Sequence, residues 1–194
     1  MNMKRISFII FLILFFPFLQ NAQENANKKF LLKFGWIEAP EIGLNPGFQN
    51  AYDSATPDLY GINLELEFPT KNPRINIVSG TVFLNSYKST VTINGGGVFT
   101  GLSTKFGNEH IGANINFSAG IFSFKKITKH YDINFVETYI ETRATNGLGA
   151  ISSLGFYVKF GRFGLAPNAQ IIYSGGTDLS MTIIGFNLPI LIEL

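Results

Sequence analysis

The sequence predicts an all-β protein: a closed antiparallel up-and-down transmembrane β-barrel of eight strands, with ten strands as the alternative. Three observations lead to this prediction. Most of the chain alternates between an apolar series and a small or polar one, and a period of two is the period of a strand. Short and long connections also alternate along the chain, and the apolar series of the strands contain no charged residue.

Eight alternating runs define the expected strands. In the second run, the apolar residues from Tyr60 to Phe68 occupy every even position, and two glutamates, Glu65 and Glu67, stand among the odd ones. The fifth run alternates in the same way, with apolar residues at the odd positions from Ile111 to Ile121. In chain order the expected strands are residues 28–38, 59–69, 75–85, 97–106, 111–124, 152–161, 164–173 and 180–194.

The connections between these runs are of two kinds. Three are short turns that are polar or contain glycine or proline, residues of the kind that favour turns; these are residues 70–74, 107–110 and 161–163. The others are longer and comprise residues 39–58, 86–96, 125–151 and 174–179. An up-and-down barrel with both termini in the periplasm predicts this asymmetry, because its periplasmic turns are short and its outer loops long.

Seven of the eight runs have one apolar face that is free of charge. A lysine or arginine on the lipid face costs about 2–4 kcal/mol at the bilayer midplane, so charge-free faces favour contact with lipid. In the remaining run, 75–85, both faces carry apolar residues. The expected outward sets are Phe30, Leu32, Phe34 and Trp36; the even positions 60–68; Val98, Thr100, Leu102, Thr104 and Phe106; the odd positions 111–121; Leu154, Phe156, Val158 and Phe160; Leu165, Pro167, Ala169, Ile171 and Tyr173; and the even positions 184–194.

The opposite faces carry charges of both signs, three of each when Glu193 is included. The interior of an eight-stranded barrel is just filled by side chains, so we expect these charges to form a salt-bridged plug. Gating of slow solute passage is the alternative role. Glu193 lies at the rim and is expected to be solvated. The candidate lumen charge network is Lys33, Glu65, Glu67, Lys105 and Lys159.

Aromatic residues fall near both ends of the expected strands. Amphipathic rings prefer the two membrane interfaces, so their positions favour two aromatic belts. The alternative is that Phe and Tyr are simply good strand formers. The candidate belt residues are Trp36, Tyr60 and Tyr173 at the loop ends and Phe68, Phe106 and Phe160 at the turn ends.

The N-terminus has the layout of a secretory signal peptide over residues 1–22: Lys4 and Arg5, an apolar stretch 6–19, and a cleavage site after Ala22. The mature domain would then be 23–194, with 13 Lys and Arg remaining against 13 Asp and Glu. A neutral chain offers no global field for nucleic acid, so no nucleic-acid partner is expected. The chain contains no cysteine, which excludes disulfides and a lipidated N-terminal cysteine.

The leader, the alternating strands, the three short turns and the final strand together resemble the small eight-stranded outer-membrane β-barrels. This broad family includes the transmembrane domain of OmpA and proteins like OmpX and OmpW. The final strand, 185–194, has the glycine and alternating apolar residues of such barrels, although it ends on Leu194 and contains Pro189, which lacks an N–H. The resemblance implies a location in the cell outer membrane, surrounding lipid, and the barrel-assembly machinery as a partner during biogenesis.

No catalytic, cofactor or metal site is expected, and the chain is not predicted to be an enzyme. The two histidines, His110 and His130, are not clustered with other metal ligands. His110 falls in a turn on the periplasmic side, and His130 is expected to be a solvated loop residue. Residues 94–97, Asn-Gly-Gly-Gly, are expected to form a flexible loop, because they do not open a helix that could bind phosphate.

The connection 125–151 allows three structures: extension of the strands beyond the membrane, an extra hairpin that gives ten strands, or a short amphipathic helix at the rim. Long outer loops often carry recognition, so an extracellular ligand bound through 125–151 is one hypothesis and a disordered tether the other. The sequence thus predicts an integral outer-membrane barrel with a structural, surface-interaction or slow-permeation role.

The competing class is a soluble secreted lipocalin-like barrel. In that case the same apolar faces would point inward and bind a small hydrophobic ligand.

Overall fold

The structure is a computed structural model of the chain, and it describes residues 29–44, 58–87, 91–131, 137–176 and 180–194. The signal peptide expected at 1–22 lies outside these residues. Within the described ranges no helix is long and apolar enough to cross a membrane.

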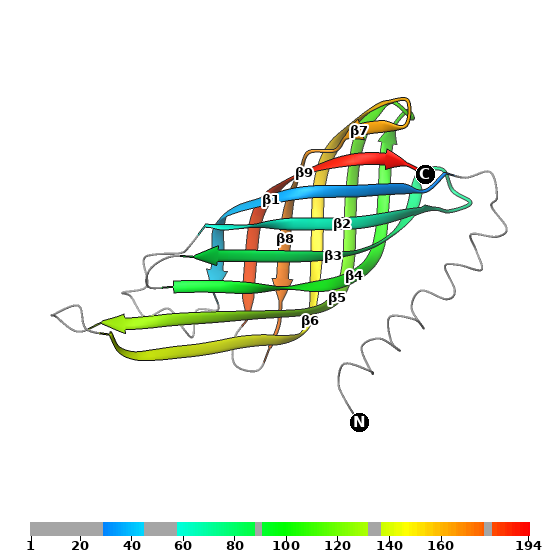
Figure 1. Cartoon of the computed structure of the whole chain (residues 1–194). Coiled ribbons are helices and arrows are strands. Elements are labelled where there is room, and N and C mark those ends of the chain that lie inside the picture. The colour runs from blue at the N-terminus through cyan, green and yellow to red at the C-terminus, as the bar shows by residue number, and fades with distance from the viewer. Residues whose placement is uncertain (1–28, 45–57, 88–90, 132–136, 177–179) are drawn as a thin grey trace.

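The described residues form nine β-strands in one antiparallel sheet (Figure 1). From β1 to β7 each strand pairs with the next, β8 pairs with β9, and β9 pairs with β1, so the sheet closes into a barrel. The strands are β1 (Leu31–Leu44), β2 (Leu59–Pro69), β3 (Ile75–Tyr87), β4 (Val91–Gly107), β5 (Ile111–Tyr131), β6 (Glu137–Phe160), β7 (Phe163–Leu165), β8 (Asn168–Ser174) and β9 (Met181–Glu193).

Two of these strands, β7 and β8, occupy one position in the ring. Both pair with β6 on one side and with β9 on the other, and only Ala166 and Pro167 separate them. The ring therefore has eight strands, as predicted, and the ten-stranded alternative is wrong.

The break between β7 and β8 also explains how Pro189 is accommodated in β9. The two backbone groups of a strand residue point to the same neighbouring strand, and the Pro189 carbonyl accepts a hydrogen bond from the Ala166 amide (2.9 Å). The missing N–H of Pro189 therefore faces the interruption in the strand. A proline here removes a hydrogen bond where the ladder is already broken.

The pairing is staggered around the ring, which shows that the strands are tilted. When the paired residues are followed once around the ring from Leu31, the row returns to β1 at Ile42, 11 residues farther along the strand (42 less 31). A bulge between Glu38 and Glu41 contributes one of these residues. Each step along the row moves away from the three short turns. The row of paired residues starts at Leu31 and runs through Glu67, Val78, Gly101, Ser118, Ile151, Ile172 and Ile183 to Ile42.

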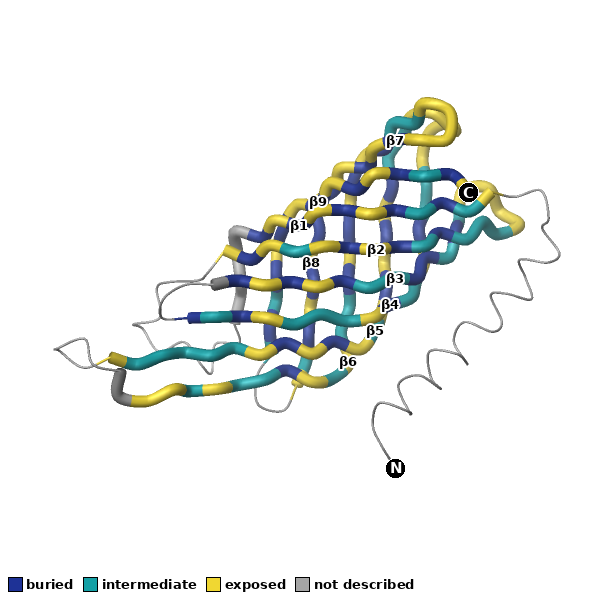
Figure 2. The backbone as a smooth tube through the Cα atoms, viewed as in Figure 1, coloured by how far each residue is buried: buried dark blue, intermediate teal, exposed yellow. Residues whose placement is uncertain are grey.

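Burial alternates along the strands and confirms the predicted faces (Figure 2). Every large apolar residue of the seven outward sets is exposed or half-buried, with Phe186 at 67% and Phe156 at 69%. In β3, Ile75, Ile77 and Phe83 face outward. The apolar residues on the other face of β3 point into the barrel and are buried; these are Val78, Val82 and Leu84.

The three short turns and both ends of the barrel domain lie at one end of the barrel, the turn end. The Leu194 amide donates to the Phe30 carbonyl (2.9 Å), which ties the first and last described segments together. In the turn between β6 and β7, Gly161 has a φ of 62°, a conformation that favours glycine. The opposite end, with the long connections, is the loop end.

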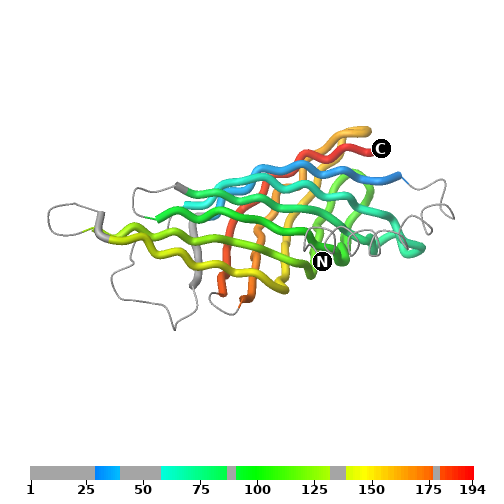
Figure 3. The backbone as a smooth tube through the Cα atoms, turned by 60° about the horizontal axis from the view of Figure 1, so that its bottom comes forward, coloured from blue at the N-terminus to red at the C-terminus, as the bar shows by residue number. Residues whose placement is uncertain are grey.

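Several strands extend farther toward the loop end than predicted. The described parts of the connection, 125–131 and 137–151, form neither an extra hairpin nor a helix, because β5 and β6 pair with each other along them, with one register shift between His130 and Tyr131. At 21 and 24 residues, β5 and β6 are about twice as long as the roughly 9–11 residues that cross a bilayer. Figures 1 and 3 show the β5–β6 hairpin running beyond the other strands.

The glycine run 94–97 lies within β4, so its prediction as a flexible loop is wrong. The ring of Phe122 on β5 covers the inward glycines of both neighbouring strands. A Cβ on Gly97 would lie 2.3 Å from Phe122 Cδ1, and one on Gly149 would lie 2.6 Å from Cδ2. The glycines are therefore part of the packing around this ring.

Candidate functional site: the barrel interior and the projecting hairpin

Four of the predicted interior charges meet near the turn end. Lys33 Nζ on β1 lies 3.2 Å from Glu67 Oε2 and 3.6 Å from Glu65 Oε2 on β2. Lys105 Nζ on β4 lies 3.2 Å from Glu67 Oε1. Glu67 is 1% exposed and bridges the two lysines, so it is the centre of this group.

Each of the two carboxylates also accepts a hydrogen bond from an amide side chain. Asn63 Nδ2 donates to Glu65 (2.7 Å), and Asn76 Nδ2 donates to Glu67 (2.9 Å). Buried charges are tolerated only when they are paired and hydrogen-bonded. The group has two cations and two carboxylates, so it is neutral as a unit. We call Lys33, Glu65, Glu67 and Lys105 the luminal charge group.

Lys159 belongs to a second, separate group at the turn-end rim. It forms an ion pair with Glu193, which also pairs with Lys29. The expectation that Glu193 is solvated is wrong, since this residue is 8% exposed. A pocket of about 480 Å³ opens at this end and has Glu67, Lys105 and Lys159 in its wall, so the luminal charges are reached from the turn end.

The interior toward the loop end is filled by apolar side chains. Phe122 and Phe124 are fully buried and stack with ring centroids 6.5 Å apart, and every strand except β7 contributes residues to the layer around them. This half of the interior is lined mainly by buried apolar side chains, whereas a water-filled barrel has a polar interior. This apolar layer consists of Ile37, Ala39, Leu59, Val78, Val82, Leu84, Val91, Ile93, Phe99, Phe122, Phe124, Ile151, Ile172, Met181 and Ile183.

Sequence reasoning did not identify the apolar layer. On β4, β5 and β6 the inward face carries glycine and serine as well as members of this layer. The inward faces of these strands were therefore interpreted as small and polar. The signal was present in Phe99, Phe122 and Phe124, three large inward residues on adjacent strands.

The candidate belt residues all lie on the outer face. Trp36 and Tyr60 stack toward the loop end, with ring centroids 6.1 Å apart and an interplanar angle of 11°. Tyr173 is also exposed there. At the turn end, Phe68 contacts Phe30 edge to face at 5.5 Å, and Phe106 and Phe160 are exposed. The outer face thus presents these rings near both ends of the strands.

The projecting hairpin carries a polar cluster near its tip. The His130 and Tyr139 rings stack with centroids 4.1 Å apart, and His130 Nε2 lies 3.5 Å from Glu141 Oε2. Arg143 Nε donates to Glu141 at 2.5 Å, and this hydrogen bond lowers the pKa of the Glu141 carboxyl below its usual value. The expectation that His130 is simply a solvated loop residue is therefore wrong.

The outer edge of this hairpin has no partner strand within the described residues. Among the described residues, positions 137–147 of β6 pair only with β5, because pairing with β8 begins at Gly149. The Leu148 carbonyl accepts from the Gly175 amide (3.1 Å), so the backbone groups of the even positions point away from β5. An unpaired row of N–H and C=O groups is a template for a further strand.

The other histidine, His110, lies in the turn between β4 and β5, as predicted, where it is exposed and 3.5 Å from Glu109. No group of three or more His, Cys, Asp or Glu side chains in the described ranges is arranged to hold a metal ion.

Comparison with solved structures identifies the fold. No protein-family model and no curated protein sequence matches the chain. Ail, the attachment invasion locus protein of Yersinia pestis, matches with a TM-score of 0.53 and 11% identity over 86% of this chain and 97% of Ail. Neisserial surface protein A matches with a TM-score of 0.52 and 8% identity over 82% of this chain and 95% of that protein. The chain therefore has the fold of the small eight-stranded outer-membrane β-barrels.

Proposed function

We propose that this protein is an outer-membrane barrel that presents the β5–β6 hairpin for recognition outside the cell. The observation that supports recognition is the length of β5 and β6, which greatly exceeds the length needed to cross a bilayer. In this proposal residues 1–22 are the export signal, the barrel is the membrane anchor, and the loop end faces the exterior.

The outer face supports placement in a membrane. Large apolar side chains cover it between the two sets of aromatic rings, and a monomeric soluble protein rarely exposes a patch of this extent. The soluble lipocalin-like alternative requires a ligand cavity lined by apolar residues and a polar exterior. Here the apolar layer is closely packed, and the exterior of the barrel is apolar.

The interior argues against slow permeation. A solute that passes the luminal charge group meets the apolar layer, where Phe122 and Phe124 are completely buried. An ion that enters such a layer loses its hydration without gaining polar partners. The luminal charge group is accordingly proposed as a structural plug.

Shortening the hairpin tests the recognition role. Lys126 and Arg143 are directly opposite in the β5–β6 ladder, so residues 127–142 can be replaced by Asn-Gly, which favours a two-residue hairpin turn. Cells that display the full chain should adhere several-fold better to surfaces coated with laminin, fibronectin or collagen than cells with the shortened chain. Equal adhesion to all three surfaces would contradict the proposal, provided that unheated samples of both chains migrate as folded barrels on gels.

A single proline tests whether the open edge of β6 carries the recognition. Thr142 is an even position, so its N–H points away from β5, and Thr142→Pro removes an edge donor while the β5 ladder is kept. Adhesion should fall with Thr142→Pro and remain with Thr142→Val, which keeps the N–H. Equal adhesion of these two variants would place recognition in the side chains of the hairpin instead of its edge.

A further inference from the structure

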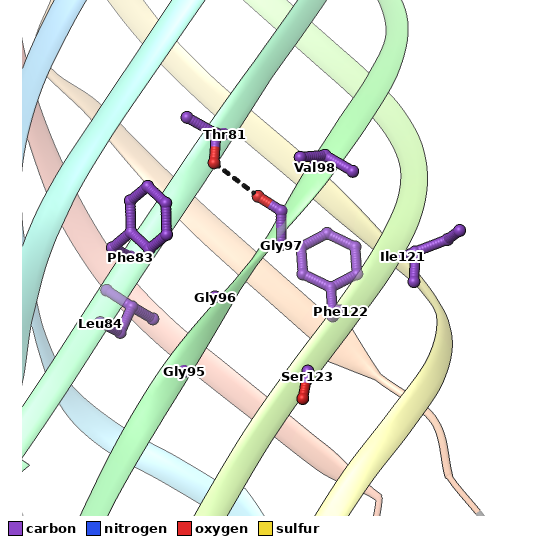
Figure 4. A pocket seen from close by; sticks show the side chains of 10 residues that line it. All are labelled: Thr81, Phe83, Leu84, Gly95, Gly96, Gly97, Val98, Ile121, Phe122 and Ser123. Carbon is purple, nitrogen blue, oxygen red and sulfur yellow. Dashed lines mark hydrogen bonds between the residues drawn. The ribbon is translucent and has the colours of Figure 1, made fainter. Parts of the chain in front are cut away.

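An apolar groove of about 540 Å³ lies on the outer face of β3, β4 and β5 (Figure 4). Its floor is the backbone around Gly96, whose partners are Phe83 on β3 and Ser123 on β5. Val98 and Ile121 form its end nearer the middle of the barrel. The groove exists because an outward position in the middle of three strands has no side chain.

No side chain can be added at Gly96 without a movement of the strands. A Cβ on Gly96 would lie 2.2 Å from the Val82 carbonyl oxygen and 3.1 Å from Phe83 Cδ1, so even alanine would require the strands to shift. Glycine at this position therefore keeps the apolar groove open on the surface. Its apolar walls suit a hydrocarbon chain.

The outer end of the groove changes from apolar to cationic within two residues. The pair beyond Gly96 and Ser123 toward the loop end is Asn94 and Lys125, both of which are exposed. Lys125 forms no ion pair with any side chain in the part of the chain that the structure describes. It is an available cation at the mouth of an apolar groove.

The groove lies at the level expected for the outer headgroups. Gly96 is 11 positions from Gly107, where β4 meets its turn (107 less 96), and roughly 9–11 residues span the hydrocarbon. The row that joins Trp36 to Ile62, Phe83 and Gly96 rises toward the loop end. Asn94 and Lys125 therefore lie just beyond the apolar band.

We propose that this groove is a binding site for an outer-leaflet lipid that carries a phosphate headgroup. One acyl chain lies along Gly96 between Phe83 and Ile121, and the phosphate contacts Lys125 and the Asn94 amide. Burial in the groove does not by itself favour one lipid over another, because every lipid tail is equally apolar. Selectivity comes from the charge-assisted contact between Lys125 and the phosphate. The proposal rests on the outer-membrane placement proposed above.

The test uses the full mature barrel in nanodiscs and native mass spectrometry, which counts the lipids that remain bound. Four probes are compared: lipid A, dephosphorylated lipid A, phosphatidylglycerol and diacylglycerol. Retention of the phosphorylated member of a pair, at least fivefold above its partner, supports the proposal. Selectivity in the lipid A pair identifies a glycolipid as the ligand, and selectivity in the phosphatidylglycerol pair identifies a phospholipid. Equal retention of all four lipids overturns it.

Three variants assign the site. Lys125→Gln should abolish the selectivity, whereas Lys71→Gln, which removes an exposed lysine from the turn between β2 and β3, should keep it. Ser123→Leu should reduce retention of both phosphorylated lipids by extending a side chain across the groove floor. Selectivity that survives both Lys125→Gln and Ser123→Leu overturns the site. Each variant is included only if its unheated gel migration is that of the folded barrel.

Insertion separates the two proposals. A chain that does not insert into lipid vesicles would overturn the outer-membrane placement. A chain that inserts but retains all four lipids equally would overturn the lipid site and leave the placement standing.

Discussion

The two halves of the barrel interior are built by the same eight strands but are filled in opposite ways. Toward the turn end the luminal charge group neutralises itself through Lys33, Glu65, Glu67 and Lys105. Toward the loop end the apolar layer packs around Phe122 and Phe124. The difference indicates that one half keeps buried charges because each has a partner of opposite charge, and the other half is filled by apolar side chains.

The two halves are expected to lose stability for different reasons when they are altered. In the luminal charge group, removal of one partner lowers the free energy of unfolding because the remaining charges are left without compensation. In the apolar layer, removal of side-chain volume lowers it because a cavity remains.

The largest effect is expected from Glu67→Ala. This change leaves Lys105 without its carboxylate and Lys33 with Glu65 alone, and removal of one partner from a buried ion pair costs about 3–5 kcal/mol. The free energy of unfolding should fall by that amount in reversible urea unfolding in lipid vesicles. Glu109→Ala in the turn between β4 and β5 is the control and should cost about 1 kcal/mol or less, because Glu109 and its partner His110 are both mostly exposed. Equal losses would mean that burial of the luminal charge group has no energetic consequence.

A loss of about 3 kcal/mol is expected from Phe122→Ala, at the lower end of the range for Phe truncation in a core. Gly97 and Gly149 have no side chains that could move into the space left by the ring. The same urea titration measures the change, and Phe117→Ala, on the lipid-facing side of β5, is the control with a smaller expected loss.

Planar-bilayer recordings extend this comparison. The native chain and Glu67→Ala should both be silent, whereas the double change Phe122→Ser and Phe124→Ser should admit ion current by making the apolar layer polar. Current through the native chain would show that the apolar layer does not close the barrel.

The sequence could predict which alternate residues of each strand face outward, because an outward face in contact with lipid carries almost no charge. All seven predicted outward faces were correct for that reason. The pairing within the barrel could not be predicted in the same way, since it depends on strand tilt. Lys33 is directly opposite Glu65 in the ladder, yet its shorter ion pair is with Glu67, whose ladder partner is Leu31. Lys159 reaches Glu193 because β7 is a single short strand between β6 and β9.

The extension of β5 and β6 could not be predicted because the hydropathy signal ends at the membrane surface. Beyond it polar residues stand on both faces of the hairpin, for example Lys129 on the outward face and Arg143 on the inward one, so the period of two disappears. The backbone ladder continues nevertheless, from Lys125 opposite Ala144 to His130 opposite Tyr139. Alternation in a sequence reports the surroundings of a strand, whereas its length is set by hydrogen bonding.

The smallest effect is expected in the hairpin, where charges lie outside the membrane. The Arg143 guanidinium hydrogen-bonds to Glu141 and lowers its pKa, so the carboxylate form is favoured in the folded hairpin. The resulting stabilisation is present above the ordinary pKa of a glutamate, about 4.3, and is lost as the pH falls through the lowered value. With both side chains about one-third exposed, the pair should contribute no more than about 0.5 kcal/mol. NMR titration of the Glu141 carboxyl carbon should give a midpoint below that of an ordinary glutamate, and Arg143→Gln should raise that midpoint toward the ordinary value. An unchanged midpoint in Arg143→Gln would show that this pair does not form in solution, in contrast to the luminal charge group, where each carboxylate is enclosed with its partners.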